Sequence, residues 1–135
     1  ADFDSLIQER REVIRGIAIR RGQTAFRKRL FAKYGARCMI SGCKIVDLLE
    51  AAHIVPYALS FDNGGSNGLL LRSDLHTLFD LNKIAINPDD LKLNINIELQ
   101  GTEYGVLSGQ PLNFDLDTQP SQSALTWRWQ RFSAS

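Results

Sequence analysis

Four polar residues between positions 53 and 80 have the types and spacing that metal-assisted chemistry requires. His53 ends an apolar run in the segment EAAHIVPY, and Asn67 closes a loop rich in glycine and asparagine. His76 and Asp80 lie four residues apart in the segment LHTLFD, so a helix there places both side chains on one face. An imidazole and a carboxylate on one helix face provide two ligands for a divalent metal.

This set of residues suits the hydrolysis of a phosphodiester bond. The attacking water must lose a proton near neutral pH, and histidine titrates in that range. An asparagine side chain or a backbone carbonyl can orient the imidazole, and a metal can stabilise charge on the phosphate. His53 is therefore a candidate general base and Asn67 a candidate orienting residue, with His76 and Asp80 as candidate metal ligands. The alternative for His53 is a histidine that only packs in the core.

Helices and strands must bring these residues together, and apolar periodicity together with turn residues predicts them. The loop that contains Asn67 is dense in Gly, Asn, Asp and Ser, and Ser73 is a plausible N-cap of the helix that carries His76. The expected elements are helices over 3–20 and 23–34, a strand over 44–55, a loop over 60–68, a helix within 69–80, two strands within 83–99, a short helix near 102–108 and a final element over 125–132.

Length and composition are typical of a single globular domain. The chain has 135 residues, of which 44% are hydrophobic and 23% are charged, and a chain of this size can bury a core without disulfide bonds. No apolar run approaches the roughly 20 residues that cross a bilayer, and no signal peptide is visible. Two cysteines do not suggest a secreted disulfide framework, so we expect a cytoplasmic protein with no membrane partner.

Charge is distributed unevenly along the chain, although the net charge is only +1. Residues 1–44 contain eleven basic and four acidic residues, whereas residues 45–135 contain five basic and eleven acidic residues. A basic segment attracts a polyanion, and the guanidinium group matches phosphate geometry; the alternative is a solvated, arginine-rich helix face. The candidate phosphate contacts are Arg20, Arg21, Arg27, Lys28, Arg29 and Arg37.

Three short motifs surround the candidate residues in the order LEAAHIVPY, NGLLL and LHTLFD. In these motifs the chain resembles the HNH endonucleases of the ββα-metal fold. It looks most like the branch in which an HNH domain ends a longer restriction endonuclease. The flanking segments RRGQTAFRKRLFAKYGARC and LTWRWQRF are similar to that branch as well, so the resemblance extends from about residue 20 to the end.

The resemblance implies a role for each candidate. His53 matches the general base, and Asn67 matches the middle asparagine, which orients the base or supports the metal site. His76 and Asp80 match two metal ligands on the helix. The implied cofactor is one divalent ion, with Mg²⁺ as the first choice and Mn²⁺, Ni²⁺ or Zn²⁺ as alternatives. The implied partner is double-stranded DNA.

The resemblance also implies an α+β fold with a ββα-metal core, N-terminal helices and additional C-terminal β-strands. In this division, residues 1–36 are a basic helical part, residues 37–82 the core and residues 83–135 a β-rich extension of one HNH nuclease domain. The implied function is metal-dependent DNA cleavage by a histidine-activated water, in restriction or defence. The alternatives are a catalytically inactive DNA-binding module and a nuclease effector or toxin domain. We also expect a longer parent protein with a further N-terminal domain, and a homodimer is compatible with the sequence.

One position departs from the family pattern. Many HNH enzymes carry a metal-binding Asp or His directly before the base, where this chain has Ala52. Either His76 and Asp80 hold the metal with waters, or another carboxylate such as Glu50 or Asp62 takes part. Strand alternation directs Glu50 away from the face of His53, so Glu50 is not expected at the metal.

Two further groups of residues have a structural alternative. Cys38 and Cys43 could bind a structural zinc together with the two histidines, but the preferred interpretation is two buried or semi-buried thiols that act as small hydrophobes. Trp127, Trp129 and Phe132 could stack on bases, but we assign this aromatic cluster to packing.

Overall fold

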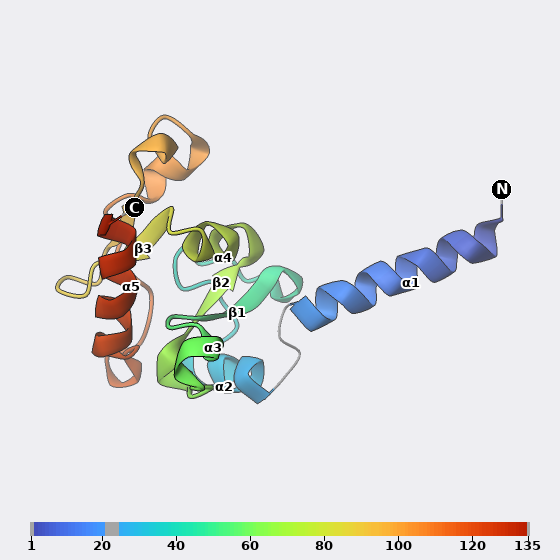
Figure 1. Ribbon diagram of the computed structural model, residues 1–135, viewed down its shortest axis with the longest axis horizontal. Coiled ribbons are helices and arrows are strands. Elements are labelled where there is room, and N and C mark those ends of the chain that lie inside the picture. The colour runs from blue at the N-terminus through green and yellow to red at the C-terminus, as the bar shows by residue number, and fades with distance from the viewer. Residues whose placement is uncertain (1, 21–24, 135) are drawn as a thin grey trace.

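The computed structural model describes residues 2–20 and 25–134 and has an α+β fold (Figure 1). Its centre is an antiparallel hairpin of two strands, with helices on both faces and a second, smaller hairpin towards the C-terminus. The helices are α1 (Phe3–Arg20), α2 (Ala25–Tyr34), α3 (Tyr57–Ser60), α4 (Ser73–Asp80) and α5 (Gln122–Ala134). The strands are β1 (Leu49–His53), β2 (Gly68–Arg72), β3 (Ile84–Ile86) and β4 (Leu93–Ile95).

The central hairpin joins the LEAAH and GLLLR segments in a register that pairs Leu49 with Arg72 and His53 with Gly68. The first four residues of each strand are buried, because helices cover both faces and the strands therefore read as continuous apolar runs rather than alternating ones. The segment expected as one long strand over 44–55 is shorter than predicted. A 3₁₀ turn at Val46–Leu48 precedes β1, so the strand begins only at Leu49. The strand ends at His53.

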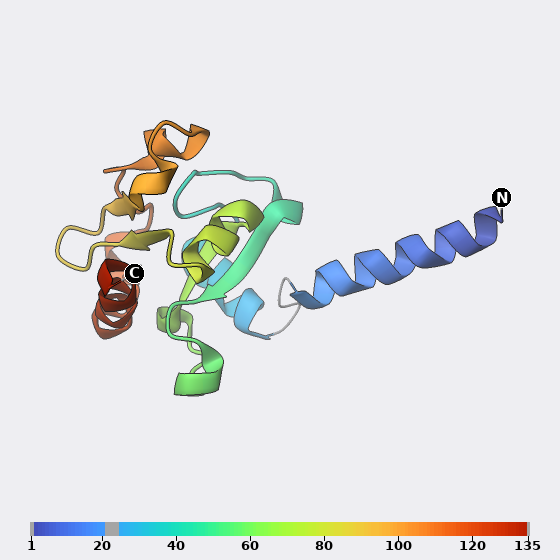
Figure 2. The same ribbon diagram turned by 45° about the horizontal axis from the view of Figure 1, so that its top comes forward.

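Helices α2 and α4 cover opposite faces of the hairpin (Figures 1 and 2). Leu30 of α2 and Leu75 and Phe79 of α4 have no exposed surface, so both helices are held by the burial of apolar side chains, which stabilises by about 1.5–3 kcal/mol for each large residue. Helix α4 begins at Ser73, the residue predicted as its N-cap, so the N-cap lies one residue earlier than predicted. Arg72 occupies its N-cap, and its side chain pairs with Asp74 in the first turn.

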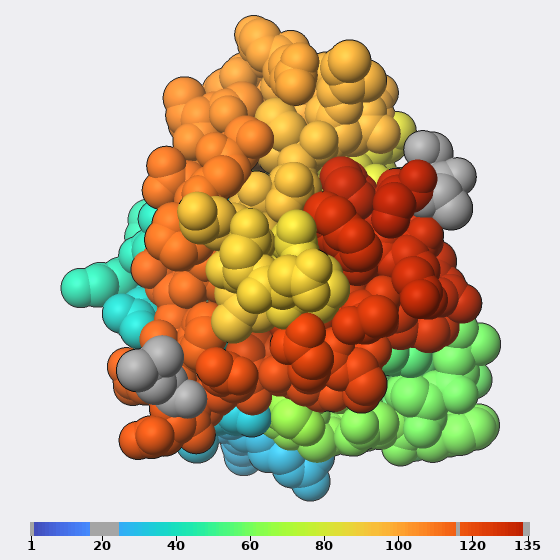
Figure 3. All heavy atoms as spheres, turned by 90° about the vertical axis from the view of Figure 1, so that its left-hand side faces the viewer, coloured from blue at the N-terminus to red at the C-terminus, as the bar shows by residue number. Residues whose placement is uncertain are grey.

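The C-terminal extension is less rich in strands than predicted. Strands β3 and β4 do form a hairpin around the NPDD turn, with Ile84 opposite Ile95, but each has only three residues. A 3₁₀ turn at Glu103–Leu107 confirms the short helix near 102–108. The final element is helix α5, which packs against β3 and lies beside the β3–β4 turn on the face seen in Figure 3. The sequence TWRWQRF alternates weakly and forms a helix because one side of it covers the small hairpin.

Helix α1 extends away from the rest of the structure in both ribbon views (Figures 1 and 2). Its apolar residues Leu6, Ile7, Val13 and Ile14 are each at least half exposed, so the amphipathic pattern predicts the helix correctly although no described element packs on its apolar side. Across residues 2–20 and 25–134, none of the helices combines the length and the hydropathy that a membrane-crossing segment needs.

Candidate active site

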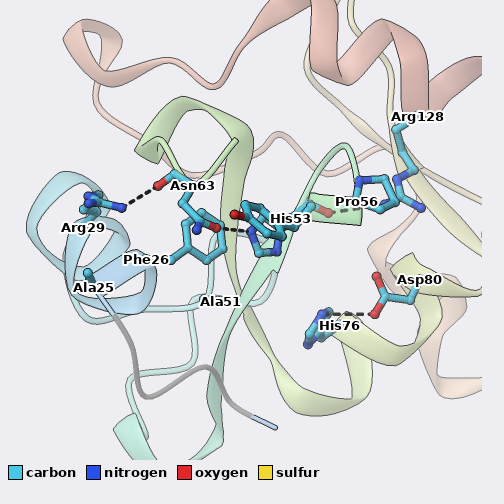
Figure 4. A pocket seen from close by; sticks show the side chains of 11 residues that line it. Ala25, Phe26, Arg29, Ala51, His53, Pro56, Asn63, His76, Asp80 and Arg128 are labelled. Carbon is cyan, nitrogen blue, oxygen red and sulfur yellow. Dashed lines mark hydrogen bonds and ion pairs between the residues drawn. The ribbon is translucent and has the colours of Figure 1, made fainter. Parts of the chain in front are cut away.

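His53 is held on two sides by residues from different elements (Figure 4). Its Nε2 lies 2.8 Å from Oδ1 of Asn63, which is in the loop between α3 and β2. Its ring stacks on that of Phe26 in α2, with a centroid distance of 4.0 Å and an interplanar angle of 9°. The imidazole is only partly buried. It is therefore fixed in orientation and still accessible, which a general base requires.

Asn67 does not contact His53, contrary to one of its predicted roles. Its amide nitrogen donates to the carbonyl oxygens of Val55 and Asp62, each at 3.0 Å, and its Oδ1 accepts from the Val55 amide at 2.9 Å. Asn67 is 2% exposed, so these three bonds satisfy a buried amide and close the loop around it. The asparagine that reaches His53, the candidate base, is Asn63. Both lie in one loop rich in turn residues, and the family motif singled out Asn67 rather than Asn63.

His76 lies between two carboxylates. Its Nδ1 is 2.7 Å from Oε1 of Glu50, and its Nε2 is 3.1 Å from Oδ2 of Asp80. Burial lowers the pKa of His76, but the hydrogen bonds and charges of Asp80 and Glu50 outweigh burial and hold the pKa above its ordinary value. His76 and Asp80, predicted to share one helix face, are thus in contact. Glu50, which was not expected at the metal site, is a second contact of His76.

Strand alternation places the side chains of Glu50 and His53, both in β1, on opposite faces of the hairpin. The Glu50 side chain points to α4, where it meets His76, and the His53 side chain points to α2, where it meets Phe26. Glu50 is 5% exposed, so its charge depends on the hydrogen bond to His76 for compensation. Glu50 is on the face opposite His53, as the alternation predicts.

The donors at His76 and Asp80 fit a divalent cation in type and proximity. An imidazole nitrogen and a carboxylate oxygen already adjoin, and both residues line an open pocket. Within residues 2–20 and 25–134, no three His, Cys, Asp or Glu side chains are grouped as a metal site. Ala52 is fully buried and offers no donor. If α4 holds a metal ion, it offers His76 and Asp80 as two donors, and water or a phosphate would fill the other positions.

The alternative zinc site is not formed in the described part of the chain. Cys38 and Cys43 are free thiols, and Cys38 is fully buried. The Cys38 sulfur accepts hydrogen bonds from the amides of Ser41 and Arg72, each at 3.3 Å. Cys38 thus joins the turn at 38–43 to the end of β2, which agrees with its interpretation as a packing residue.

One open pocket of about 710 Å³ brings the candidate base and the candidate metal ligands together. His53 lines it together with His76 and Asp80, and the stacked ring of Phe26 forms part of its wall (Figure 4). Arg29 contributes a cation at the same pocket. One space that a phosphate group can enter is therefore lined by His53, by the candidate ligands His76 and Asp80, and by the positive charge of Arg29.

Arg128 of α5 is a pocket residue that the sequence did not reveal. It is 6% exposed, and its guanidinium donates to the carbonyl oxygens of Ile54 at 2.9 Å and His53 at 3.3 Å. It also stacks over the ring of Phe79 at 4.6 Å. Burial lowers the pKa of this guanidinium, and the charge of Asp80 partly offsets the effect. Arg128 thereby fastens the end of β1 to α5, so the C-terminal aromatic segment supports the site.

The predicted phosphate contacts differ in where the structure places them. Arg27 is 9% exposed and donates to the carbonyl oxygens of Leu49 and Val46, so its assignment as a phosphate contact is wrong. It fastens α2 to the start of β1.

Lys28 and Arg29 are exposed on α2, and Arg29 donates to the Asn63 carbonyl at 2.9 Å. Arg37 is half-buried at a different hollow. Arg21 and the side chain of Arg20 lie outside the described residues.

Comparison with known proteins finds one family model and a similar solved structure. The family model described as HNH endonuclease matches residues 38–87. The solved structure titled "Modification dependent TagI restriction endonuclease" is similar to this chain with a TM-score of 0.57 and 24% sequence identity; the match covers 77% of this chain and 36% of that chain. This chain thus spans about a third of that protein's length. The comparison with curated proteins finds no match. Residues 38–87 therefore match the HNH endonuclease family in sequence, and the chain carries the α+β fold of that family.

Proposed function

We propose that this protein is a metal-dependent endonuclease that hydrolyses phosphodiester bonds of double-stranded DNA. The observation that carries the proposal is the shared pocket: His53 opens onto the same space as the adjoining pair His76 and Asp80. A base on one wall and two metal donors on another are the minimal set for this hydrolysis. The name of the structural neighbour, a restriction endonuclease, supports DNA as the substrate and restriction as the context.

The chain's own residues divide the reaction between them. His53 accepts a proton from water, the water oxygen forms a bond to phosphorus, and the bond from phosphorus to the 3′ oxygen breaks. The proton passes to the imidazole, and the leaving oxygen takes one from solvent. When bound at His76 and Asp80, a divalent ion such as Mg²⁺ supplies charge stabilisation for the phosphate and the leaving oxygen. Mn²⁺, Ni²⁺ and Zn²⁺ are compatible with the same donors.

DNA would be positioned through its backbone by exposed cations on α2. Lys28 and Arg29 lie on the helix whose Phe26 stacks on the base, so a phosphate bound there is close to the pocket. Contacts of this kind give affinity that falls with salt and carry no sequence information. We therefore propose that residues 25–134 grip the duplex without reading its sequence.

Plasmid nicking tests this proposal. Supercoiled DNA is incubated with the protein and Mg²⁺ or Mn²⁺, and the wild type is compared with His53→Ala and with Gln130→Ala, an exposed change on α5. We expect His53→Ala to lower the nicking rate by about a hundredfold or more and Gln130→Ala to leave it unchanged. Equal rates for all three proteins would refute His53 as the base.

A second candidate function is a DNA-binding module of the same fold without turnover. Ala52 favours it, because it is a buried apolar residue at the position where many HNH enzymes hold the metal. Salt-sensitive DNA binding by the wild type, with no cleavage in any of the four metals, would establish this second function. Cleavage that chelation by EDTA abolishes and Mg²⁺ restores would exclude it.

A further inference from the structure

We propose that Asn63 and Phe26 form a clamp that holds His53 as the tautomer protonated on Nε2, which leaves Nδ1 free to accept the proton of water. The inference rests on the proposed role of His53 as the base and names the two residues that position it. Neither residue touches the reacting atoms in this scheme. Phe26 also lies outside residues 38–87, the segment matched by the family model.

The hydrogen bond to Asn63 determines the tautomer. Oδ1 of an amide has no proton and can only accept, so the His53 nitrogen 2.8 Å away must be the donor. A neutral imidazole carries one proton, and with that proton on Nε2 its Nδ1 has a free lone pair. Among the described residues, Nδ1 of His53 has no hydrogen-bond partner. His53 lines the pocket that it shares with His76 and Asp80.

The stack on Phe26 fixes the plane of the ring. At 4.0 Å and 9° the two rings are parallel and in contact, and Phe26 is 4% exposed, so it cannot move without disturbing the core. Gly68 makes room for it: a Cβ at that position would lie 2.7 Å from Cζ of Phe26 and from Cδ2 of Leu30. Phe26 fixes the plane of the imidazole and Asn63 fixes its Nε2 edge, so the ring can neither tilt nor flip.

Asn63 is itself held by the loop around it. Its carbonyl oxygen accepts from Arg29 of α2 at 2.9 Å. The neighbouring turn is closed by the Gly64 amide, which donates to Asp62 Oδ1 at 2.8 Å, and by Asn67, which donates to the Asp62 carbonyl. The orienting amide therefore sits on a braced loop, as the positioning of a reactive group requires.

Helix α2 contributes to the clamp at two positions. Its residue Phe26 holds the ring of the base, and its residue Arg29 holds the loop that carries Asn63. Helix α2 thus positions the base in addition to offering cations to DNA. Its sequence, AFRKRLFAKY, suggested only a basic amphipathic helix.

The tautomer of His53 can be measured directly by NMR on the full chain labelled with ¹⁵N. Two-bond ¹⁵N–¹H spectra distinguish protonated from unprotonated ring nitrogens, and the spectrum of His53→Gln assigns the signals, because the chain has only two histidines. At a pH where His53 is neutral, we expect the wild type to show the proton on Nε2. We expect Asn63→Ala to show a mixture of both tautomers, and the control Asn113→Ala, an exposed asparagine, to match the wild type.

Kinetics on DNA provide the second readout. Asn63→Ala should lower kcat by about ten- to a hundredfold with little change in KM, and Phe26→Leu should lower it less, because burial is retained and the stack is lost. Asn63→Asp keeps the acceptor but adds a negative charge that stabilises imidazolium. It should therefore keep the Nε2 proton and move the acid limb of the pH–rate profile to higher pH. The ionisable groups around His53 are Tyr57 of α3, Arg29 of α2, Arg128 of α5 and, across the pocket, His76 and Asp80 of α4.

The two readouts separate failure of the clamp from failure of the proposed function. A wild-type spectrum with the proton on Nδ1, or an Asn63→Ala spectrum identical to the wild type, would overturn the clamp whether or not the protein cleaves DNA. Absence of cleavage by the wild type, together with the expected spectra, would leave the clamp established and the nuclease function refuted.

Discussion

Replacing Gly68 by alanine tests the packing that surrounds the base. Gly68 lies opposite His53 in the central hairpin, and its backbone is extended, with φ of −144° and ψ of 155°, so alanine is compatible with the backbone. An added Cβ would lie 2.7 Å from atoms of both Phe26 and Leu30, inside van der Waals contact. The side chains of Phe26 and Leu30 are buried. We expect them to shift together with α2 and weaken the stack on His53.

The net effect is the difference between two opposing contributions. A glycine-to-alanine change at a compatible position stabilises by about 0.4–1 kcal/mol, because it restricts the unfolded chain. Overpacking a well-packed core costs about 1–3 kcal/mol. The steric cost dominates at Gly68, since three side-chain atoms lie within 3.0 Å of the new Cβ. We therefore expect a loss of about 1–2 kcal/mol, which for a chain of this length lowers Tm by about 4–7 °C.

The assay is urea and thermal unfolding, with Gly105→Ala as the matched control. The Cβ added at Gly105 would meet no atom closer than 3.6 Å, so this change should be neutral or slightly stabilising. In a Leu30→Ala background the cost of Gly68→Ala should fall, because two of the three close contacts are removed and only Cζ of Phe26 stays within 3.0 Å. A wild-type Tm for Gly68→Ala, or a cost unchanged in the Leu30→Ala background, would refute the argument.

Two further predictions concern polar contacts near the site. Although burial raises the pKa of Asp74, the hydrogen bonds from Arg72 and Tyr104 outweigh it and hold that pKa below its ordinary value. Asp74→Asn should therefore cost about 1 kcal/mol at pH 7. The difference in unfolding free energy between Asp74→Asn and the wild type, measured by urea unfolding, should shrink as the pH falls below 3.8, the ordinary pKa of an aspartate, because protonation removes the same stabilisation from the wild type. A difference that does not change with pH would contradict this prediction. Arg27→Met should cost about 2 kcal/mol by removing charged donors from two backbone carbonyl groups. Lys28→Met should change the free energy of unfolding by no more than about 0.5 kcal/mol and should reduce the salt slope of DNA binding by about one unit. The reverse pattern, in which Lys28→Met destabilises the protein and Arg27→Met lowers the salt slope, would refute the assignment of Arg27 to packing.

Periodicity and turn residues predicted the fold around the site well, because those signals are local. The spacing of His76 and Asp80 implies one helix face, and α4 places the two side chains in contact. The apolar LEAA and LLL runs predicted buried strands, and both form the central hairpin. The C-terminal segment was harder to predict. Its alternating aromatics suit either a strand or a helix, and only packing against β3 selects α5.

The roles of individual polar residues were less predictable, because they depend on contacts distant in sequence. Nothing in the sequence distinguishes Arg27, which bonds to carbonyls some twenty residues away, from its exposed neighbour Lys28. Arg128 reaches the backbone at His53 across more than seventy residues. Such partners are set by how the helices pack on the hairpin, which no local pattern encodes.

Local patterns along the chain establish the residue types of the site, their spacing and the elements that carry them. His53 at a strand end and His76 and Asp80 one helical turn apart follow from periodicities of two and 3.6, which act over a few residues. Contacts between distant segments settle which asparagine meets His53, which arginines are buried and which carboxylate meets His76. These choices follow from the packing of α2, α4 and α5 around one short hairpin, where a buried donor or acceptor must find its partner in space rather than along the chain.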